Sequence, residues 1–239
     1  VGGNALGSNT IGSFNSAFGY KSLQNNTIGD SNSAFGLYSL KANTTGANNT
    51  AMGRGSLQNN TVGSANNAFG YGALYTSTTG SNNNAFGYKA LYANTSGSFN
   101  SAFGDKALRY NTIGTRNSAF GISALMYTTT ASSNSAFGYM SLRFNTTGVN
   151  NVAIGFQALY VNTGGYNNVA IGNAVLQANT IGINNVAVGH NSLITNVSGY
   201  ANTAVGFQAL YYNTTNNNSA FGYKALFANT TGNNNTAVG

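Results

Sequence analysis

Apolar and polar residues recur along this chain at one fixed spacing. Asn15–Gly29 reads NSAFGYKSLQNNTIG and Asn218–Gly232 reads NSAFGYKALFANTTG, so two distant segments follow the same pattern. When all such segments are aligned, an alanine stands at the third position of each, 17 residues after the last, with one 16-residue step before Ala220. A pattern repeated at a fixed period predicts stacked structural units instead of one central core.

The repeated unit predicts a coil of short strands and turns. It reads N-[ST]-A-F-G-Y-[KQ]-[AS]-L-x-x-N-T-[TI]-G-x-x, numbered here from position 1 at its first Asn. Seventeen residues are too few for a helical repeat, which takes more than about 30. We expect one strand at Asn15–Tyr20, a second at Ser22–Asn26, and turns in the Asn- and Gly-rich segments. The prediction is an all-β fold: a parallel β-solenoid (β-roll) of about 14 coils, with two short strands per coil, as one continuous array over 1–239.

The alternation of side chains along a strand predicts which residues form the core. Neighbouring residues face opposite sides, so Phe18 at position 4 faces away from Ala17 and Gly19. We expect the bulky residue and the Leu of position 9 to lie inside, leaving a smooth small-residue face that another backbone can approach. In the alternative, Ala and Gly point inward and a column of Phe is exposed. The predicted core residues are Phe18, Leu23, Phe35, Leu40, Phe86, Leu91, Ile154 and Leu159.

Position 1 is always Asn, and stacked Asn side chains can form an amide ladder along a stack of strands. We therefore predict a structural ladder at this position. Its members are Asn15, Asn32, Asn49, Asn66, Asn83, Asn100, Asn117, Asn134, Asn151, Asn168, Asn185, Asn202, Asn218 and Asn235.

Charge and composition exclude several classes of partner. Charged residues make up 5% of the chain, against about 25% in ordinary domains. The net charge of +7 comes from nine bases and two acids, so it reflects a scarcity of acids, and the bases form no dense stripe of the kind that nucleic acids require. No apolar run approaches the roughly 20 residues of a membrane helix. We expect neither nucleic-acid binding nor a membrane span.

Residues that could carry catalysis are few and scattered. Asp30 and Asp105 are more than four coils apart along the stack, too far to act as paired carboxylates. His190 stands at the variable sixth position, where we expect an exposed side chain. The chain has no Cys, so it has neither disulfides nor thiolate metal ligands. We predict no enzymatic activity, no cofactor and no metal site.

Aromatic residues gather at positions 6, 10 and 11. Tyr71, Tyr88, Tyr139 and Tyr223 share position 6 and are the candidate glycan contacts, because exposed rings can stack on sugars. The alternative is that the rings stack on one another or lie in a subunit interface.

Eleven Asn residues begin an N-x-[ST] sequon, mostly in predicted turns, and are candidate N-glycosylation sites. They are Asn25, Asn43, Asn48, Asn59, Asn94, Asn145, Asn196, Asn213, Asn217, Asn229 and Asn234.

Three later segments resemble a known family of repeats. NNVAIGFQAL (Asn150–Leu159), NNVAIGNAVL (Asn167–Leu176) and NTAVGFQAL (Asn202–Leu210) resemble the NSVAIG-type head repeats of trimeric autotransporter adhesins. They are also similar to the NTAVGYQAL-type repeats of phage tail-fibre-like proteins. The resemblance implies a β-roll that trimerises. The present unit is longer than the usual adhesin unit, and it carries Phe in place of an aliphatic residue in most coils.

The repeats predict a structural protein. Both ends of the sequence fall in mid-unit without atypical capping coils, so we expect either a piece of a longer array or ends covered by other copies. The leading hypothesis is the shaft of an extracellular or surface fibre, filament or adhesin that associates with itself, as a trimer or end to end. The alternative is a glycan-binding adhesin or tail-fibre module; ice binding by the Thr column at position 13 ranks third.

Overall fold

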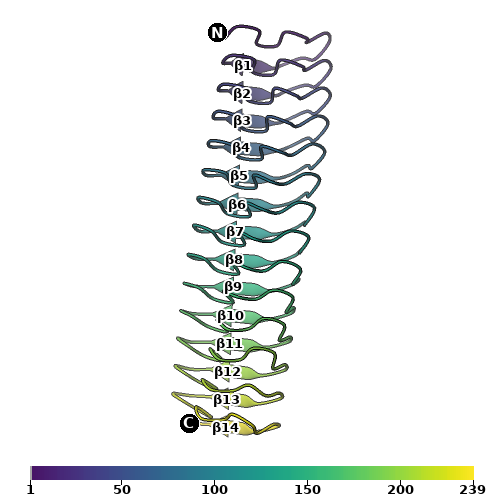
Figure 1. Ribbon diagram of the computed structural model, residues 1–239. Helices are drawn as coiled ribbons and strands as arrows, with labels where there is room; N and C mark the ends of the chain where they lie inside the picture. Colours follow the sequence, from purple (N-terminus) through teal and green to yellow (C-terminus); the bar gives the residue numbers. More distant parts are fainter. Residues whose placement is uncertain (1) are drawn as a thin grey trace. The chain divides into compact units, whose positions relative to one another are not determined.

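The computed structural model describes residues 2–239, and the chain divides into two compact units, Val1–Asn117 and Ser118–Gly239. Each unit is a stack of coils in which successive strands lie side by side (Figure 1). The described residues contain no helix. The predicted all-β parallel β-solenoid is therefore confirmed, whereas one continuous array over 1–239 stays a prediction.

Each coil contributes one strand of three residues, at positions 2 to 4 of the repeat. The first unit holds β1 (Ser16–Phe18), β2 (Ser33–Phe35), β3 (Thr50–Met52), β4 (Asn67–Phe69), β5 (Asn84–Phe86) and β6 (Ser101–Phe103). The second holds β7 (Ser118–Phe120), β8 (Ser135–Phe137), β9 (Val152–Ile154), β10 (Val169–Ile171), β11 (Val186–Val188), β12 (Thr203–Val205), β13 (Ser219–Phe221) and β14 (Thr236–Val238).

Within each unit the strands pair in parallel with exact repeat register. In the pair β1–β2, for example, Ala17 lies opposite Ala34 and Phe18 opposite Phe35. The 16-residue step does not break this register, because Ala204 of β12 still pairs with Ala220 of β13. The missing residue is therefore absorbed in the turn that precedes β13, and the strands on both sides of it keep their register.

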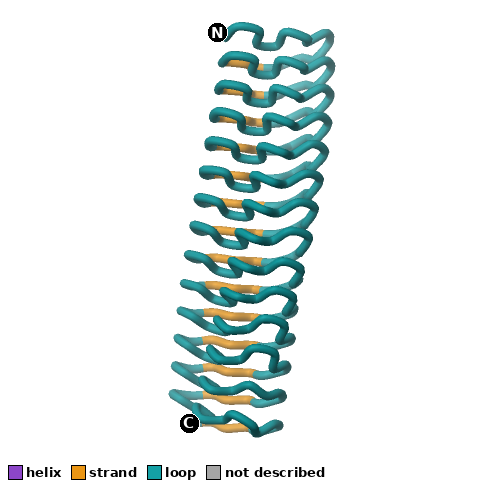
Figure 2. Tube along the Cα trace, viewed as in Figure 1, coloured by secondary structure: helices purple, strands orange, loops and turns teal. Residues whose placement is uncertain are grey.

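The predicted second strand of each coil is replaced by two consecutive turns (Figure 2). Ser22 N–H donates to Gly19 O (3.2 Å) and Asn26 N–H to Leu23 O (3.2 Å), closing the two turns, while Leu23 N–H still donates to Ser39 O of the next coil (3.0 Å). Lys21 and Leu23 take the left-handed conformation, with φ of 56° and 47°. A strand needs extended backbone, and the left-handed residues at positions 7 and 9 interrupt it. This segment is therefore hydrogen-bonded to the next coil but does not form a β-strand.

The strand ends at a glycine whose backbone no other residue can adopt. In the coil of Gly87, φ is +138°, far from the region that side chains tolerate. A Cβ at Gly87 would also lie inside contact distance of Gly104 O in the next coil. Position 5 is Gly in every coil because the backbone here takes a positive φ and passes close to the neighbouring coil.

The strand faces the core with the side opposite to the predicted one: Ala at position 3 points inward and the bulky residue at position 4 points outward. Ala34 and Ala85, in the middle of their strands, are fully buried, whereas Phe18 is 51% exposed. Phe35 and Ile154 are also exposed and Phe86 is half-buried, so the prediction of these four as core residues is wrong. The physical reason is space: Leu side chains and two columns of Asn amides already fill the coil, and only a methyl group fits beside them. Leu23, Leu40, Leu91 and Leu159 are fully buried.

Candidate functional site

The Asn residues of position 1 form a buried ladder that ties each coil to the next. Asn49 donates from its backbone N–H (3.0 Å) and from Nδ2 (3.1 Å) to Asn32 Oδ1, and Asn49 Nδ2 also donates to Gly63 O (2.9 Å). One side chain thus joins two neighbouring coils and bridges the strand to the turn of its own coil. The same arrangement recurs in the second unit, where Asn168 donates to Asn151 and to Gly182 O.

A second amide ladder runs along position 12, and the sequence reasoning missed it. Asn43 Nδ2 donates to Asn26 Oδ1 (2.7 Å) and to Gly46 O (2.9 Å). Asn162 does the same in the second unit, to Asn145 Oδ1 (2.7 Å) and Gly165 O (2.9 Å). The signal was present: position 12 is Asn in every unit except those with Ser77 and Thr128. The sequence pattern alone assigns this Asn to a turn.

The Thr column at position 13 is used within the fold. The N–H groups of Thr27, Ile28 and Gly29 all donate to Thr44 O, at 3.0, 3.2 and 3.3 Å, and Thr27 Oγ1 donates to the same oxygen (3.1 Å). Four donors therefore converge on one carbonyl of the next coil. Thr44, Thr61 and Thr78 donate their hydroxyls to the next coil in the same way. Hydroxyls used in this way are not available as a row of donors to ice, which weakens the ice-binding hypothesis.

The outer face of the sheet carries a column of stacked apolar side chains. In the first unit the rings of Phe69 and Phe86 stack at 4.6 Å, and those of Phe86 and Phe103 at the same distance. In the second unit Phe120 stacks on Phe137 at 4.9 Å. Stacking lowers the cost of exposing these rings without covering them. The column is an apolar strip that a partner could cover.

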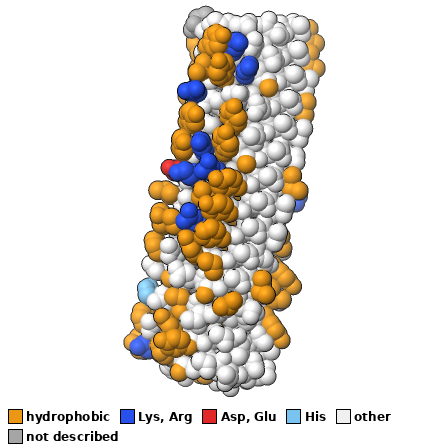
Figure 3. Space-filling model, in the orientation of Figure 1, with side chains coloured by type: hydrophobic (Ala, Val, Ile, Leu, Met, Phe, Trp, Pro, Cys, Tyr) orange, Lys and Arg blue, Asp and Glu red, His pale blue; other side chains and the backbone are white. Residues whose placement is uncertain are grey.

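A corner of the coil, at positions 6, 7 and 10, carries aromatic and basic side chains together. Such side chains gather along one side of the visible face (Figure 3). Tyr71 stacks on Tyr88 at 5.5 Å and Tyr75 on Tyr92 at 5.1 Å. The Lys89 ammonium lies 5.1 Å from the ring centre of Tyr88 and 5.5 Å from that of Tyr92, so it spans the two aromatic columns.

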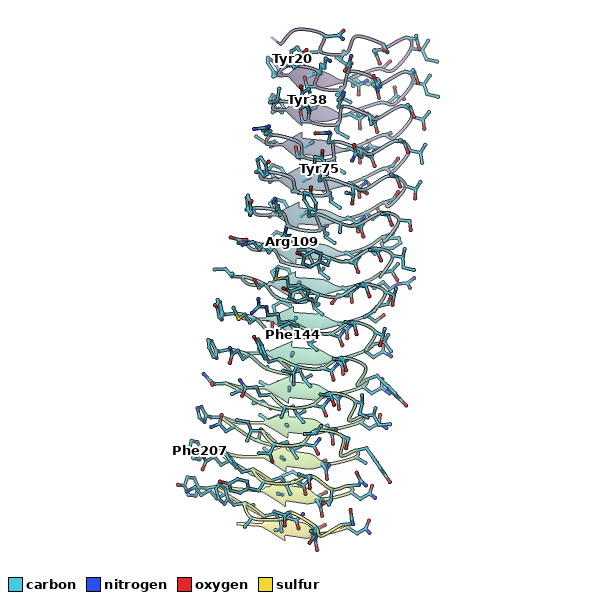
Figure 4. The ribbon with its side chains drawn as sticks, viewed as in Figure 1. Tyr20, Tyr38, Tyr75, Arg109, Phe144 and Phe207 are labelled. Atoms are coloured by element: carbon cyan, nitrogen blue, oxygen red, sulfur yellow. The ribbon has the colours of Figure 1, made fainter. Side chains whose placement is uncertain are left out.

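Where position 7 is glycine, no side chain spans these columns and a groove opens. Its volume is ≈ 240 Å³. Figure 4 labels Tyr38 and Tyr75 of its lining. The groove belongs to the first unit and is lined by Tyr38, Arg54, Gly55, Gln58, Tyr71, Gly72, Tyr75, Lys89 and Tyr92.

The four candidate glycan contacts fall in different surroundings. Tyr71 lines the groove and Tyr88 stacks on it. In the second unit Tyr139 stacks on Phe156 at 5.5 Å and Tyr223 on Phe207 at 5.4 Å. All four rings are exposed, and each stacks on a neighbour along its column, the arrangement given above as the alternative to glycan contact.

Sequons at position 12 lie inside the fold. Asn43, Asn94, Asn145, Asn196 and Asn213 are fully buried, and the Nδ2 atom to which a glycan would be attached donates hydrogen bonds there. The prediction of these five as glycosylation sites is contradicted, because the second ladder occupies the amide. Asn229, half-buried, is a further rung and donates to Asn213 Oδ1 (2.8 Å). Asn59 is also half-buried, and Asn25, Asn48, Asn217 and Asn234 are exposed. At these five residues and at Asn229 the assignment stays a prediction.

The remaining candidate residues form no cluster. His190 is exposed and its ring stacks on Phe207 at 5.4 Å. Asp105 lies 3.3 Å from the ammonium of Lys106. Among residues 2–239 no three His, Cys, Asp or Glu side chains come together as metal ligands, and no helix there is long and apolar enough to cross a membrane.

A comparison of the chain with family models, curated proteins and solved structures finds no match.

Proposed function

We propose that the chain is a structural protein, a segment of the shaft of an extracellular or surface fibre. The observation that supports this most is the interior of the coil, where the same Leu, Ala and Asn contacts recur from coil to coil in both units. Each coil is held by its neighbours through backbone and side-chain hydrogen bonds, so stability is shared along the stack. Such a stack can be lengthened by adding coils without a change in its contacts.

We propose further that the Phe column of position 4 packs against another copy of this chain. Phe69, Phe86 and Phe103 are spaced at 4.6 Å, the spacing of the strands that carry them. A second copy presents an equivalent column at the same spacing, so the exposed ring edges of the two columns can pack against each other in register along the stack. The surface of a globular partner does not, in general, present apolar side chains at this regular spacing. Self-association also agrees with the trimers that the resemblance to adhesin repeats implies.

The experiment is electron microscopy and analytical ultracentrifugation of the full chain and of the double variant Phe69→Ser, Phe86→Ser. We expect elongated particles containing several copies, and loss of association in the variant with an unchanged circular dichroism spectrum. Monomeric wild-type protein at micromolar concentration would contradict self-association, and compact particles would contradict the shaft. The matched control is Tyr139→Ser, which removes an exposed ring from another column.

A further inference from the structure

We propose that the groove at Gly55 and Gly72 is a binding site for an acidic saccharide, one or two sugar rings that bear a carboxylate or sulfate. This proposal is independent of the shaft, since a fibre needs no such site. Its basis is a local departure from the repeat, seen in the floor, the walls and the charge of the groove.

The floor of the groove is open because of two successive glycines that the backbone does not require. Gly55 and Gly72 have φ of +67° and +63°. Lys21, Met140 and Gln157 adopt φ of 56°, 57° and 52° at the same position of other coils. A side chain is thus tolerated here. The two glycines remove the long side chain that Lys89 extends between the aromatic columns in the next coil, and the rings of Tyr75 and Tyr92 lie close over the glycines instead.

The walls of the groove are aromatic and held in place. The Tyr75 ring leans over Gly55, where a Cβ would meet ring carbons at 3.3 and 3.4 Å. Tyr75 is kept in this pose by stacking on Tyr92 and by Gln58 Nε2, which donates to its hydroxyl (3.1 Å). Tyr71 lines the groove and stacks on Tyr88. Rigid aromatic walls beside a polar amide suit a sugar, which has apolar C–H faces and hydroxyl edges.

Charge selects an acidic ligand. The groove contains Arg54 and Lys89, while Asp30 and Asp105, the only acids of the chain, do not line it. The Arg54 guanidinium lies 5.8 Å from the ring centre of Tyr71, where it can form charge-assisted hydrogen bonds to a carboxylate or sulfate on a sugar stacked nearby.

Size favours one or two sugar rings over an extended polyanion. Tyr38 and Lys89, at position 7 of the coils before and after the two glycines, line the groove as well. The opening between them spans two coils, roughly 10 Å at the usual strand spacing. Its volume of ≈ 240 Å³ lies just below the range of about 300–1,000 Å³ that holds drug-sized ligands. A single-stranded nucleic acid needs a continuous basic stripe instead.

The test is titration calorimetry of the full chain with digalacturonic acid, its neutral analogue galactobiose, inorganic sulfate and a short oligothymidylate. We expect the acidic disaccharide to bind at least about tenfold more tightly than the other three, the ratio that one added charge-assisted contact of 1.4 kcal/mol supplies. No binding of the disaccharide, equal binding of galactobiose or sulfate, or tighter binding of the oligonucleotide would each overturn the proposal.

Two variants separate groove recognition from simple charge attraction. Gly72→Lys fills the groove while adding a positive charge, so it should abolish binding although it makes the surface more basic. Asn191→Lys adds the same charge at the equivalent position of the second unit and should leave binding unchanged. Retained or stronger binding by Gly72→Lys, with a native circular dichroism spectrum, would mean that the groove is not the site. Tyr71→Ala is a second variant that removes one aromatic wall of the groove. We expect its affinity for the acidic disaccharide to fall by at least about tenfold.

Discussion

Asn60 Oδ1 and Ser77 Oγ occupy successive rungs of the position 12 ladder, and both are buried without a hydrogen-bond partner. At most other rungs the later Asn donates its Nδ2 to the amide oxygen of the Asn one coil earlier, as Asn60 itself does to Asn43 (2.7 Å). The serine hydroxyl is too short to replace that amide. The ladder is therefore interrupted at this coil, and the interruption leaves two unsatisfied polar atoms in the core.

Ser77→Asn should complete the ladder. Its Nδ2 would donate to Asn60 Oδ1 and its Oδ1 would accept from Asn94 Nδ2, which now donates only to Gly97 O. An unsatisfied buried group costs about 1–3 kcal/mol, so we expect the free energy of unfolding to rise by about 1 kcal/mol or more in denaturant titrations. Ser77→Ala, the control, removes the unsatisfied hydroxyl but leaves Asn60 Oδ1 without a donor, so it should raise the free energy of unfolding by less than Ser77→Asn does. A lower midpoint for Ser77→Asn would contradict the ladder.

The inward orientation of alanine predicts opposite effects at two neighbouring residues. Ala85→Leu forces a larger side chain into a filled interior and should destabilise the fold by about 1–3 kcal/mol. Phe86→Ser, on the outer face, should change the unfolding midpoint of the isolated chain less. The measurement is the thermal unfolding midpoint of both variants. A larger loss for Phe86→Ser than for Ala85→Leu would indicate that Phe, and not Ala, points into the core.

Glycine at position 5 should be irreplaceable, whereas glycine at position 7 should not. Gly87→Ala places a methyl group against Gly104 O at φ of +138°, and we expect a loss of more than about 2 kcal/mol because two backbones must separate. Gly55→Ala at φ of +67° meets only side-chain atoms and should cost about 1–2 kcal/mol, the ordinary left-handed penalty. The free energy of unfolding of both variants is measured by chemical denaturation. Equal losses for Gly87→Ala and Gly55→Ala would show that the close approach of two backbones does not explain the requirement for glycine at position 5.

The position 1 ladder can be tested with adjacent asparagines. Asn83→Ala removes the Nδ2 that donates to Asn66 Oδ1 and Gly97 O and the Oδ1 that accepts from the backbone N–H and Nδ2 of Asn100. We expect a loss of more than about 2 kcal/mol from these four broken buried hydrogen bonds and the void. Asn82→Ala changes an exposed residue with φ of 58° and should lose about 1 kcal/mol or less, because only its left-handed preference is removed. Comparable losses in the two variants would argue against the ladder as a source of stability.

Burial divides the sequons into two classes. If the chain is secreted through a glycosylating pathway, the exposed Asn48 should carry a glycan and the buried Asn43 should not, because only Asn48 leaves its side chain outside the coil. Mass spectrometry of glycopeptides from folded, secreted protein measures this directly. A glycan on Asn43 in protein with native circular dichroism would contradict the second ladder at that rung.

The candidate groove shows where sequence reasoning ends for this chain. Tyr71 and its column were visible in the repeat, because aromatic residues recur at position 6. The groove depends instead on Gly55 and Gly72, which stand at a variable position and look like any other change of surface residue. The fold brings the columns of Tyr71 and Tyr75 to one corner of the coil, and only there do the two glycines line a groove between aromatic walls.

The period and the recurrence of Leu, Asn and Gly at set positions determined that this chain forms stacked parallel coils, since identical residues at a fixed spacing need identical environments. The tertiary structure alone decided which side of the strand is the inside. Alternation places Ala85 and Phe86 on opposite faces but is satisfied by either orientation. The choice rests on volume: Leu91 and two rows of Asn amides leave room for a methyl group and none for a ring, so the phenylalanines lie outside.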